Sequence, residues 1–221
     1  MRILFVSATE FEVPALISNV GFSISDLGKG IYRSSLYPQH ALIVTGVGMV
    51  ATAYALGCEL ATNQYDLAIN LGIAGSFDRS IALGDVVEVT EDTLTELGAE
   101  DGDAFLPITQ LGFGEDTFVA TANLADLYKG KPLPKVTAIT VNTVHGNTAS
   151  IQKLQTRLNP ELESMEGAAF FYACKDAGVA SLQIRAVSNY VEKRNREAWQ
   201  IGLAIKNLNT FALELLKRLD V

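Results

Sequence analysis

Short apolar runs alternate with amphipathic segments along most of the chain. Apolar runs bounded by turn residues predict strands at 2–8, 66–71, 84–90, 136–141 and 181–188, and a hairpin from 31–37 to 41–44. Apolar residues at helical spacing predict helices at 50–61, 148–158, 165–177 and 197–219, and 10–17 is typical of a loop that enters a helix. This alternation favours an α/β fold, expected to be one domain over residues 1–221 with a mixed, mainly parallel central sheet and helices on both faces.

Two segments depart from this alternation. Residues 91–135 are irregular, and we interpret them as an insertion or lid-like loop rather than a second domain. Residues 72–75 (GIAG) follow an apolar strand and indicate a tight loop. Ligands of open α/β sheets bind beyond the carboxyl ends of the strands. We therefore expect the functional site to be surrounded by five segments: 7–13, 45–49, 72–77, 142–147 and 188–192.

Composition narrows the class of protein. Of the 221 residues, 48% are hydrophobic and 19% are charged, which permits a large core and argues against disorder. The net charge of −8, with no strong Lys/Arg cluster, argues against a nucleic-acid partner. The start lacks the features of a signal peptide and no apolar run reaches about 18 residues, so we expect no membrane span and a cytoplasmic protein. Cys58 and Cys174 fall in apolar helical patterns and are expected to be buried free thiols.

Glu12 follows the first predicted strand and precedes an apolar stretch that begins at Val13. A carboxylate in a partly desolvated position has a raised pKa and can act as a general base. An acidic residue in the first turn of a helix also complements the helix dipole, and Pro14 suits a helix start. The residues alone leave both interpretations open.

A glycine pattern follows the second strand region. Gly46-x-Gly48 between a strand and a helix, with Asp66 about 20 residues further on, imitates a dinucleotide-binding fingerprint. The acidic residue of that fingerprint should end the next strand, whereas Asp66 begins it. We interpret the glycines as a turn that permits a close approach, which leaves an NAD-binding oxidoreductase as an alternative.

Acidic and basic residues in the last third of the chain suggest a polar site. Glu166 enters an apolar helix, where a carboxylate can accept hydrogen bonds from the two hydroxyls of a ribose or can simply complement the helix dipole. Arg185 interrupts an apolar strand, and a buried arginine needs an anionic partner such as Glu12 or Glu166.

Asn189 ends the same strand. Its amide offers a donor and an acceptor, which suits a 6-oxopurine with acceptors at N7 and O6 and a donor at N1–H, although a loop cap is the alternative. His145 either lines a pocket or is a loop histidine without a role. His40 is the other histidine of the chain, and a total of two argues against a metal site, so we expect no metal and no cofactor.

Taken in order, four stretches resemble the nucleoside phosphorylase/nucleosidase superfamily over nearly the whole chain except 91–135: 8–13 (ATEFEV), 72–75 (GIAG), 163–166 (ESME) and 185–189 (RAVSN). Within it, 96–102 and 188–196 are similar to the futalosine hydrolase subgroup. The resemblance implies hydrolysis of futalosine to hypoxanthine and dehypoxanthine futalosine, a step of menaquinone biosynthesis, by a homodimer.

The resemblance also implies roles for individual residues. Glu12 would activate water, Asn189 would contact the leaving base at N7, and Glu166 with Met165 would hold the ribose hydroxyls. The purine would be bracketed by Val144 and His145, with Ala74 and Gly75 contributing the backbone of the site. Arg194 and Arg196, in a basic stretch, would bind the carboxylate of the 5′ substituent, although a solvated charged turn is the alternative.

Two features favour hydrolysis of a 6-oxopurine nucleoside. Phosphorolysis needs cations for phosphate, but the N-terminal loop carries Glu10 and Glu12 and no arginine lies between Arg2 and Arg33. Adenine-specific nucleosidases carry Asp where Asn189 stands. The alternatives are a methylthioadenosine/S-adenosylhomocysteine or aminodeoxyfutalosine nucleosidase, which releases adenine, and a noncatalytic nucleoside-binding protein.

Overall fold

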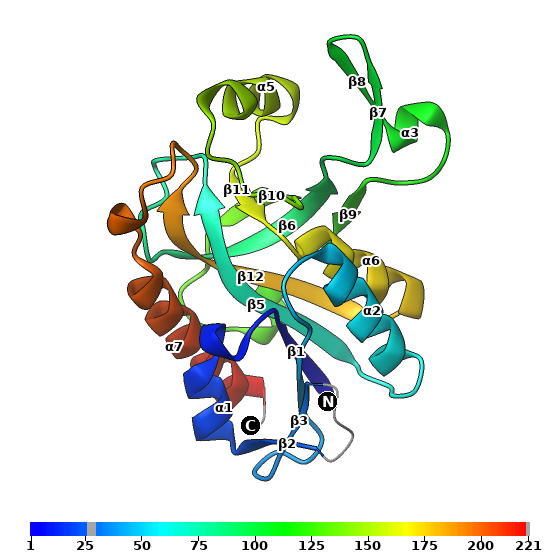
Figure 1. Cartoon of the computed structure of the whole chain (residues 1–221). Helices are drawn as coiled ribbons and strands as arrows, with labels where there is room; N and C mark the ends of the chain where they lie inside the picture. Colours follow the sequence, from blue (N-terminus) through cyan, green and yellow to red (C-terminus); the bar gives the residue numbers. More distant parts are fainter. Residues whose placement is uncertain (26–29, 220–221) are drawn as a thin grey trace.

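The computed structural model describes residues 1–25 and 30–219 (Figure 1). Its strands are β1 (Ile3–Ser7), β2 (Phe22–Ile24), β3 (Ile31–Ser34), β4 (Ala41–Val44), β5 (Leu67–Ser76), β6 (Val86–Leu94), β7 (Gly98–Asp101), β8 (Ala104–Pro107), β9 (Thr117–Val119), β10 (Lys135–Thr140), β11 (Leu162–Ser164) and β12 (Ala180–Tyr190). Its helices are α1 (Pro14–Val20), α2 (Met49–Leu60), α3 (Ile108–Leu111), α4 (Leu124–Leu127), α5 (Thr148–Leu158), α6 (Gly167–Ala177) and α7 (Ile201–Leu219), with 3₁₀ turns at Glu10–Glu12 and Arg196–Ala198.

One large mixed sheet organises the chain, in the order β11-β10-β6-β12-β5-β1-β4-β3-β2. The pairs that β1 makes with β4 and β5 are parallel, as are β5–β12 and β6–β10, whereas β6–β12 and the β2–β3–β4 edge are antiparallel. Because β11 pairs with both β10 and β5, the strands β5, β12, β6, β10 and β11 close on themselves. The predicted α/β fold with a mixed sheet is confirmed.

Helices cover both faces of this sheet, and strand alternation divides the core accordingly. In β1, Leu4 and Val6 belong to the core under α2 and α6, while Ile3 and Phe5 belong to the core under α1 and α7. Successive side chains of a strand point to opposite faces, so a strand buried on both faces has to be apolar throughout. This explains why the first strand has no polar residue before Ser7.

The prediction for 72–75 was wrong, because these residues lie inside β5 rather than in a loop. At Gly72 a Cβ atom would lie 2.0 Å from Nη1 of Arg185. The glycine therefore makes room for a side chain from the neighbouring strand, which sequence reasoning mistook for turn flexibility.

The prediction for 91–135 as an irregular lid-like loop was also wrong in part. β6 continues to Leu94, the hairpin of β7 and β8 follows, and α3, β9 and α4 complete the segment. Figure 1 shows the hairpin and α3 projecting from the sheet, and β9 adds to the sheet beside β6. β7 (GAED) has two acidic residues and β8 (AFLP) ends in a proline, so these short, partly exposed strands lack the apolar runs that marked the other strands.

Smaller corrections concern element ends and one cysteine. The helix expected from 165 begins at Gly167, and the helix expected from 197 begins at Ile201. Cys174 is buried as predicted, but Cys58 is exposed, because the buried face of α2 is formed by Thr52, Leu56 and Glu59. Both cysteines are free. No helix in the described part of the chain is long and apolar enough to cross a membrane.

Candidate active site

All five predicted segments border a single cavity of about 420 Å³ beyond the carboxyl ends of the central strands. Its volume is within the range of small-molecule sites. Each of these predicted site residues contributes to its wall: Glu12, Ala74, Gly75, Val144, His145, Met165, Glu166, Asn189 and Arg194. Arg196, which was predicted beside Arg194, is absent from the described lining.

Glu12 lies at one end of the cavity with little access to water. It ends the 3₁₀ turn after β1 and is 7% exposed. Its Oε1 accepts from the backbone N–H of Ile73 at 3.1 Å, and its Oε2 accepts from the backbone N–H and the hydroxyl of Thr9 at 3.1 and 3.0 Å.

The environment of Glu12 shifts its proton affinity. Burial raises the pKa of Glu12 above its usual value of 4.5, while the Ile73 amide and the Arg185 cation oppose that rise and the Glu166 carboxylate adds to it. A fixed carboxylate with a raised pKa at the edge of a cavity is suited to accept a proton from water.

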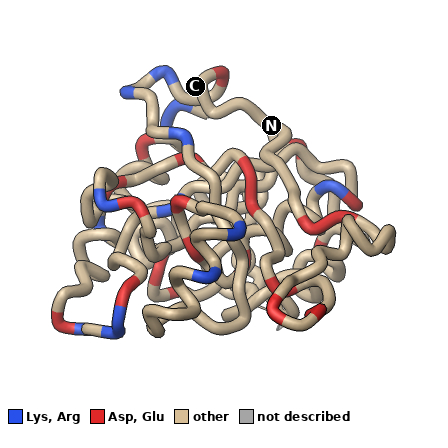
Figure 2. Tube along the Cα trace, turned by 90° about the horizontal axis from the view of Figure 1, so that it is seen from above, with Lys and Arg blue, Asp and Glu red and all other residues tan. Residues whose placement is uncertain are grey.

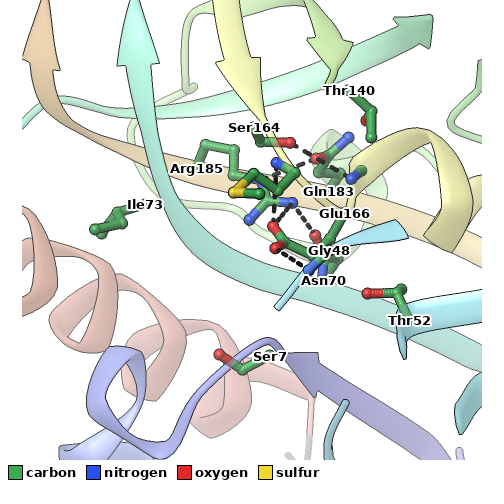
Figure 3. Close-up of polar contacts among 12 residues, drawn as sticks. Ser7, Gly48, Thr52, Asn70, Ile73, Thr140, Ser164, Glu166, Gln183 and Arg185 are labelled. Carbon is green, nitrogen blue, oxygen red and sulfur yellow. Dashed lines mark hydrogen bonds and ion pairs between the residues drawn. The ribbon is translucent and has the colours of Figure 1, made fainter. Parts of the chain in front are cut away.

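Arg185 carries a positive charge into the interior beneath this cavity. It is 1% exposed, and its guanidinium donates to Oε1 of Gln183 at 2.9 Å and to Oδ1 of Asn70 at 2.5 Å (Figure 3). Its Nη2 lies 3.9 Å from Oε2 of Glu166, so the predicted pairing of Arg185 with a site carboxylate is confirmed. The partners Asn70 and Gln183 were missed by sequence reasoning, and the available signal was a polar residue inside each of two buried strands.

Glu166 faces the cavity from the N-terminus of α6. Its Oε1 accepts from the backbone N–H of Gly48 at 3.0 Å and its Oε2 from that of Met165 at 3.3 Å. Gly48 has a φ of 97°, a conformation that favours glycine, which lets its amide point at Glu166. The Gly46-x-Gly48 turn thus holds a carboxylate of the site, as expected for a turn that permits a close approach.

A buried carboxylate that sequence reasoning missed lies behind Arg185. Asp92 in β6 accepts from Oγ1 of Thr140 at 2.8 Å and from Nε2 of Gln183 at 3.0 Å. Burial raises the pKa of Asp92 from 3.8 to about 6, against the effect of these hydrogen bonds and of Arg185. Gly167 is required beside it, because a Cβ there would lie 2.0 Å from Oδ2 of Asp92.

The Asn189 amide contacts its two neighbours in the chain. Its Oδ1 accepts from the hydroxyl of Ser188 at 2.9 Å, and its Nδ2 donates to the carbonyl of Tyr190 at 3.1 Å. A Cβ at Gly75 would lie 3.1 Å from this Nδ2 and 3.0 Å from Cγ2 of Val191, so a glycine is required beside the amide. Asn189 lines the cavity, and its Nδ2 has a second hydrogen to donate there.

His145 has a carboxylate partner, Glu163. Oε1 of Glu163 accepts from the backbone N–H of His145 at 2.9 Å, and Oε2 of Glu163 pairs with its Nδ1. Burial raises the pKa of Glu163 above 4.5, while these contacts with His145 lower it. Both residues line the cavity.

The two arginines of the basic stretch stack on one aromatic ring. The guanidinium carbons of Arg194 and Arg196 lie 5.0 and 5.9 Å from the centre of the Trp199 ring. Trp199 and Arg194 both line the cavity. Of the two predicted anion-binding arginines, the structure brings only Arg194 to the site.

Carboxylates outnumber cations in the cavity wall. Among the described lining residues Arg194 is the one Lys or Arg, whereas four are glutamates: Glu12, Glu163, Glu166 and Glu192. Over the whole molecule acidic and basic residues are intermixed, as Figure 2 shows. In the described part of the chain no group of three or more His, Cys, Asp or Glu residues could hold a metal ion.

Comparison with known proteins gives one family and one fold. The family model of the phosphorylase superfamily matches residues 2–219. A futalosine hydrolase of Streptomyces coelicolor is 37% identical over 177 residues, which are 76% of this chain and 74% of that protein.

Two solved structures have the same fold. One is a 5′-methylthioadenosine/S-adenosylhomocysteine nucleosidase from Colwellia psychrerythraea in complex with adenine, with a TM-score of 0.82, 23% identity, and coverage of 99% of this chain and 96% of that chain. The other is a futalosine hydrolase of Helicobacter pylori, with a TM-score of 0.83, 14% identity, and coverage of 97% of each chain.

The buried charge of Arg185 supports a stability prediction. Arg185→Met removes the cation near Glu12, Asp92 and Glu166, and breaking a buried ion pair in this way should lower the free energy of unfolding by about 3–5 kcal/mol. Arg79→Met is the matched control, because its partner Glu192 and Arg79 itself are exposed, and it should cost less than about 1 kcal/mol. Urea unfolding measures both, and equal losses would contradict the role given to Arg185.

Proposed function

The chain belongs to the phosphorylase superfamily, and from that premise we propose that it hydrolyses the N-glycosidic bond of futalosine to hypoxanthine and dehypoxanthine futalosine. The observation that carries the proposal is that the buried carboxylates of Glu12 and Glu166 line the same cavity, whose described lining holds four glutamates and one arginine. Such a wall repels phosphate and favours water as the nucleophile. The identity to a futalosine hydrolase over most of the chain supports the choice of substrate.

Glu12 acts as the general base. Cleavage of the bond between C1′ and N9 leaves positive charge on the ribose and sends the bonding electrons into the purine. Water is a weak nucleophile, and a fixed carboxylate that orients it and takes its proton contributes about 10²–10⁴-fold to the rate. The hydrogen bonds from Ile73 and Thr9 hold Glu12 in one rotamer for this task.

Glu166 binds the ribose. Its carboxylate is held by the Gly48 amide and faces the same cavity as Glu12 and Met165. A carboxylate accepts hydrogen bonds from two vicinal hydroxyls, which positions C1′ relative to the water. The nearby Arg185 lies 3.9 Å from Glu166 and opposes the rise in the pKa of Glu12, so its charge offsets the negative charge of the site.

Asn189 and its neighbours hold the leaving base. Its Nδ2 donates toward N7 or O6 of hypoxanthine, on which negative charge develops during cleavage. The base lies over the backbone of Ala74 and Gly75 and beside Val144 and His145.

A second candidate function is release of adenine, by a methylthioadenosine/S-adenosylhomocysteine or aminodeoxyfutalosine nucleosidase. The relative from Colwellia psychrerythraea with adenine bound favours it. The two functions differ in the base released. A noncatalytic nucleoside-binding protein would have no need for a carboxylate with a raised pKa at the site.

A homodimer and a cytoplasmic location complete the proposal. Phe11 and Val47 line the cavity yet are 68% and 57% exposed, so a partner subunit that covers them would also close the site. Val50 and Tyr54 on α2 extend this exposed apolar surface. Two free cysteines accord with a reducing compartment such as the cytoplasm.

The first test identifies the released base. Chromatography of reactions with futalosine, aminodeoxyfutalosine, methylthioadenosine and inosine, with and without phosphate, should give hypoxanthine from futalosine most rapidly and independently of phosphate.

The variant Glu12→Gln should lower kcat at least about 100-fold, because it removes the general base that activates water. Calorimetry should show that futalosine binding is largely retained. Rapid turnover by Glu12→Gln would refute the role given to Glu12.

The native protein should show a pH dependence that reports on Glu12. Its kcat/KM should fall as the pH drops through the Glu12 pKa, which lies above 4.5, because the general base must be ionised.

The second test addresses the base contact. Asn189→Asp should lower the ratio of kcat/KM for futalosine over aminodeoxyfutalosine by about tenfold or more, because a carboxyl group at this position suits adenine better. Asn147→Asp is the control, since Asn147 caps α5 and aspartate caps equally well. An unchanged ratio in Asn189→Asp would remove the argument for hypoxanthine.

The third test addresses the 5′ substituent. Arg194→Ala should raise KM for futalosine by about tenfold and leave KM for inosine nearly unchanged, because inosine lacks the carboxylate that a charged hydrogen bond would hold. Arg196→Ala, whose arginine stacks on the same Trp199 ring outside the lining, is the comparison. Equal effects of Arg194→Ala on both substrates would rule out carboxylate binding.

A further inference from the structure

Three strands bring Glu163, Gly75 and Asn189 into one row. β11 pairs Glu163 with Gly75, and β12 pairs Asn189 with Gly75 from the other side. β12 has a register shift between Val187 and Asn189, so the pairing brings the three backbones together at an irregular point of the sheet. A Cβ at Gly75 would lie 3.1 Å from Nδ2 of Asn189 and 3.0 Å from Cγ2 of Val191, so the glycine leaves room for these two side chains. All three residues of the row line the cavity.

The Asn189 amide brings a donor to this part of the cavity. Its Nδ2 group carries two hydrogens, of which one is donated to the Tyr190 carbonyl at 3.1 Å. A 6-oxopurine has acceptors at N7 and O6, which suit the other hydrogen, but it also has a donor at N1–H. N7 and N1–H lie on opposite sides of O6, so an amide that donates to N7 does not reach N1–H, and the acceptor for N1–H comes from another residue.

His145 supplies a suitable atom. Both oxygens of Glu163 are engaged by this one residue, Oε1 by its backbone N–H at 2.9 Å and Oε2 by its ring Nδ1. An ionised carboxylate only accepts hydrogen bonds, so Nδ1 carries the hydrogen and a neutral imidazole keeps a lone pair on Nε2. Within residues 1–25 and 30–219, Nε2 has no hydrogen-bond partner and is not sealed from solvent.

We propose that Nε2 of His145 accepts a hydrogen bond from N1–H of the leaving 6-oxopurine, and that Glu163 is a positioning residue that fixes the required imidazole tautomer. The inference rests on the proposed function and adds the group that selects the base. Asn189 and His145, which line the same cavity, then bind the two hydrogen-bonding edges of the purine.

The tautomer discriminates between the two bases. Hypoxanthine has a hydrogen on N1, whereas N1 of adenine has a lone pair, which would face the lone pair of Nε2. A site that leaves buried polar groups mismatched rejects the wrong ligand by about 10- to 100-fold. Glu163 thus contributes to selection without contacting the base.

Glu163→Gln tests this directly. The Gln carbonyl would accept from the His145 backbone N–H, and the amide NH₂ would then face Nδ1. The ring hydrogen would move to Nε2, which becomes a donor that suits N1 of adenine. The ratio of kcat/KM for futalosine over aminodeoxyfutalosine should fall by about 10- to 100-fold relative to the native protein.

Glu96→Gln is the matched control. Glu96 acts on Glu163 through its charge, but its hydrogen bonds go to the backbone N–H and Nδ2 of Asn142, and the Gln carbonyl can accept from either. This variant should keep the native ratio. An unchanged ratio in Glu163→Gln, or an equal change in both variants, would overturn the proposal.

A measurement on the native protein covers the case in which Glu163→Gln does not fold. ¹⁵N NMR of the histidine ring with bound hypoxanthine should show hydrogen on Nδ1 and a lone pair on Nε2 of His145. Hydrogen on Nε2 would overturn the inference. Failure of the proposed function is distinct, because it would appear as native protein that releases no hypoxanthine from futalosine.

Discussion

The buried charge of Arg185 is the constraint around which the interior of this protein is arranged. A guanidinium that is 1% exposed is stable only where its donors are met, and the groups around it come from three strands and the start of one helix. Asn70 and Gln183 accept from it, Asp92 holds Gln183, and Glu166 supplies negative charge. Figure 3 shows Arg185 among Asn70, Gln183 and Glu166, between strands that are far apart in sequence.

The closed part of the sheet makes this arrangement possible. β11 pairs with both β10 and β5, which brings residues near 163 beside residues near 75 and 189. Glycines lie where side chains from neighbouring strands need the space, at Gly72 for Arg185 and at Gly167 for Asp92 and Gln183. Packing and polar contacts therefore depend on the same few backbone positions.

Four polar groups that line the cavity are each held by a neighbouring group. Ile73 and Thr9 hold Glu12, Gly48 holds Glu166, Ser188 holds Asn189 and Glu163 holds His145. Groups fixed in this way need little reorganisation when a ligand binds, which is a general requirement for stabilising developing charge. The arrangement links the fold to the proposed reaction, because the holding groups belong to the sheet or to the loops that follow its strands.

Local patterns in the sequence determined the α/β class, most strands and helices, the five segments around the cavity and the candidates Glu12, Glu166 and Asn189. Such features follow from apolar periodicity and from the rule that ligands bind at the carboxyl ends of parallel strands. The sequence misassigned 72–75 and missed Asn70, Asp92, Gln183 and the contact between Glu163 and His145. Only the tertiary structure decided these, as it decided that Arg194 and not Arg196 reaches the cavity. The physical reason is that a glycine in a strand, or a polar residue among apolar ones, acquires its meaning from a partner on another strand, and local periodicity contains no information about that partner.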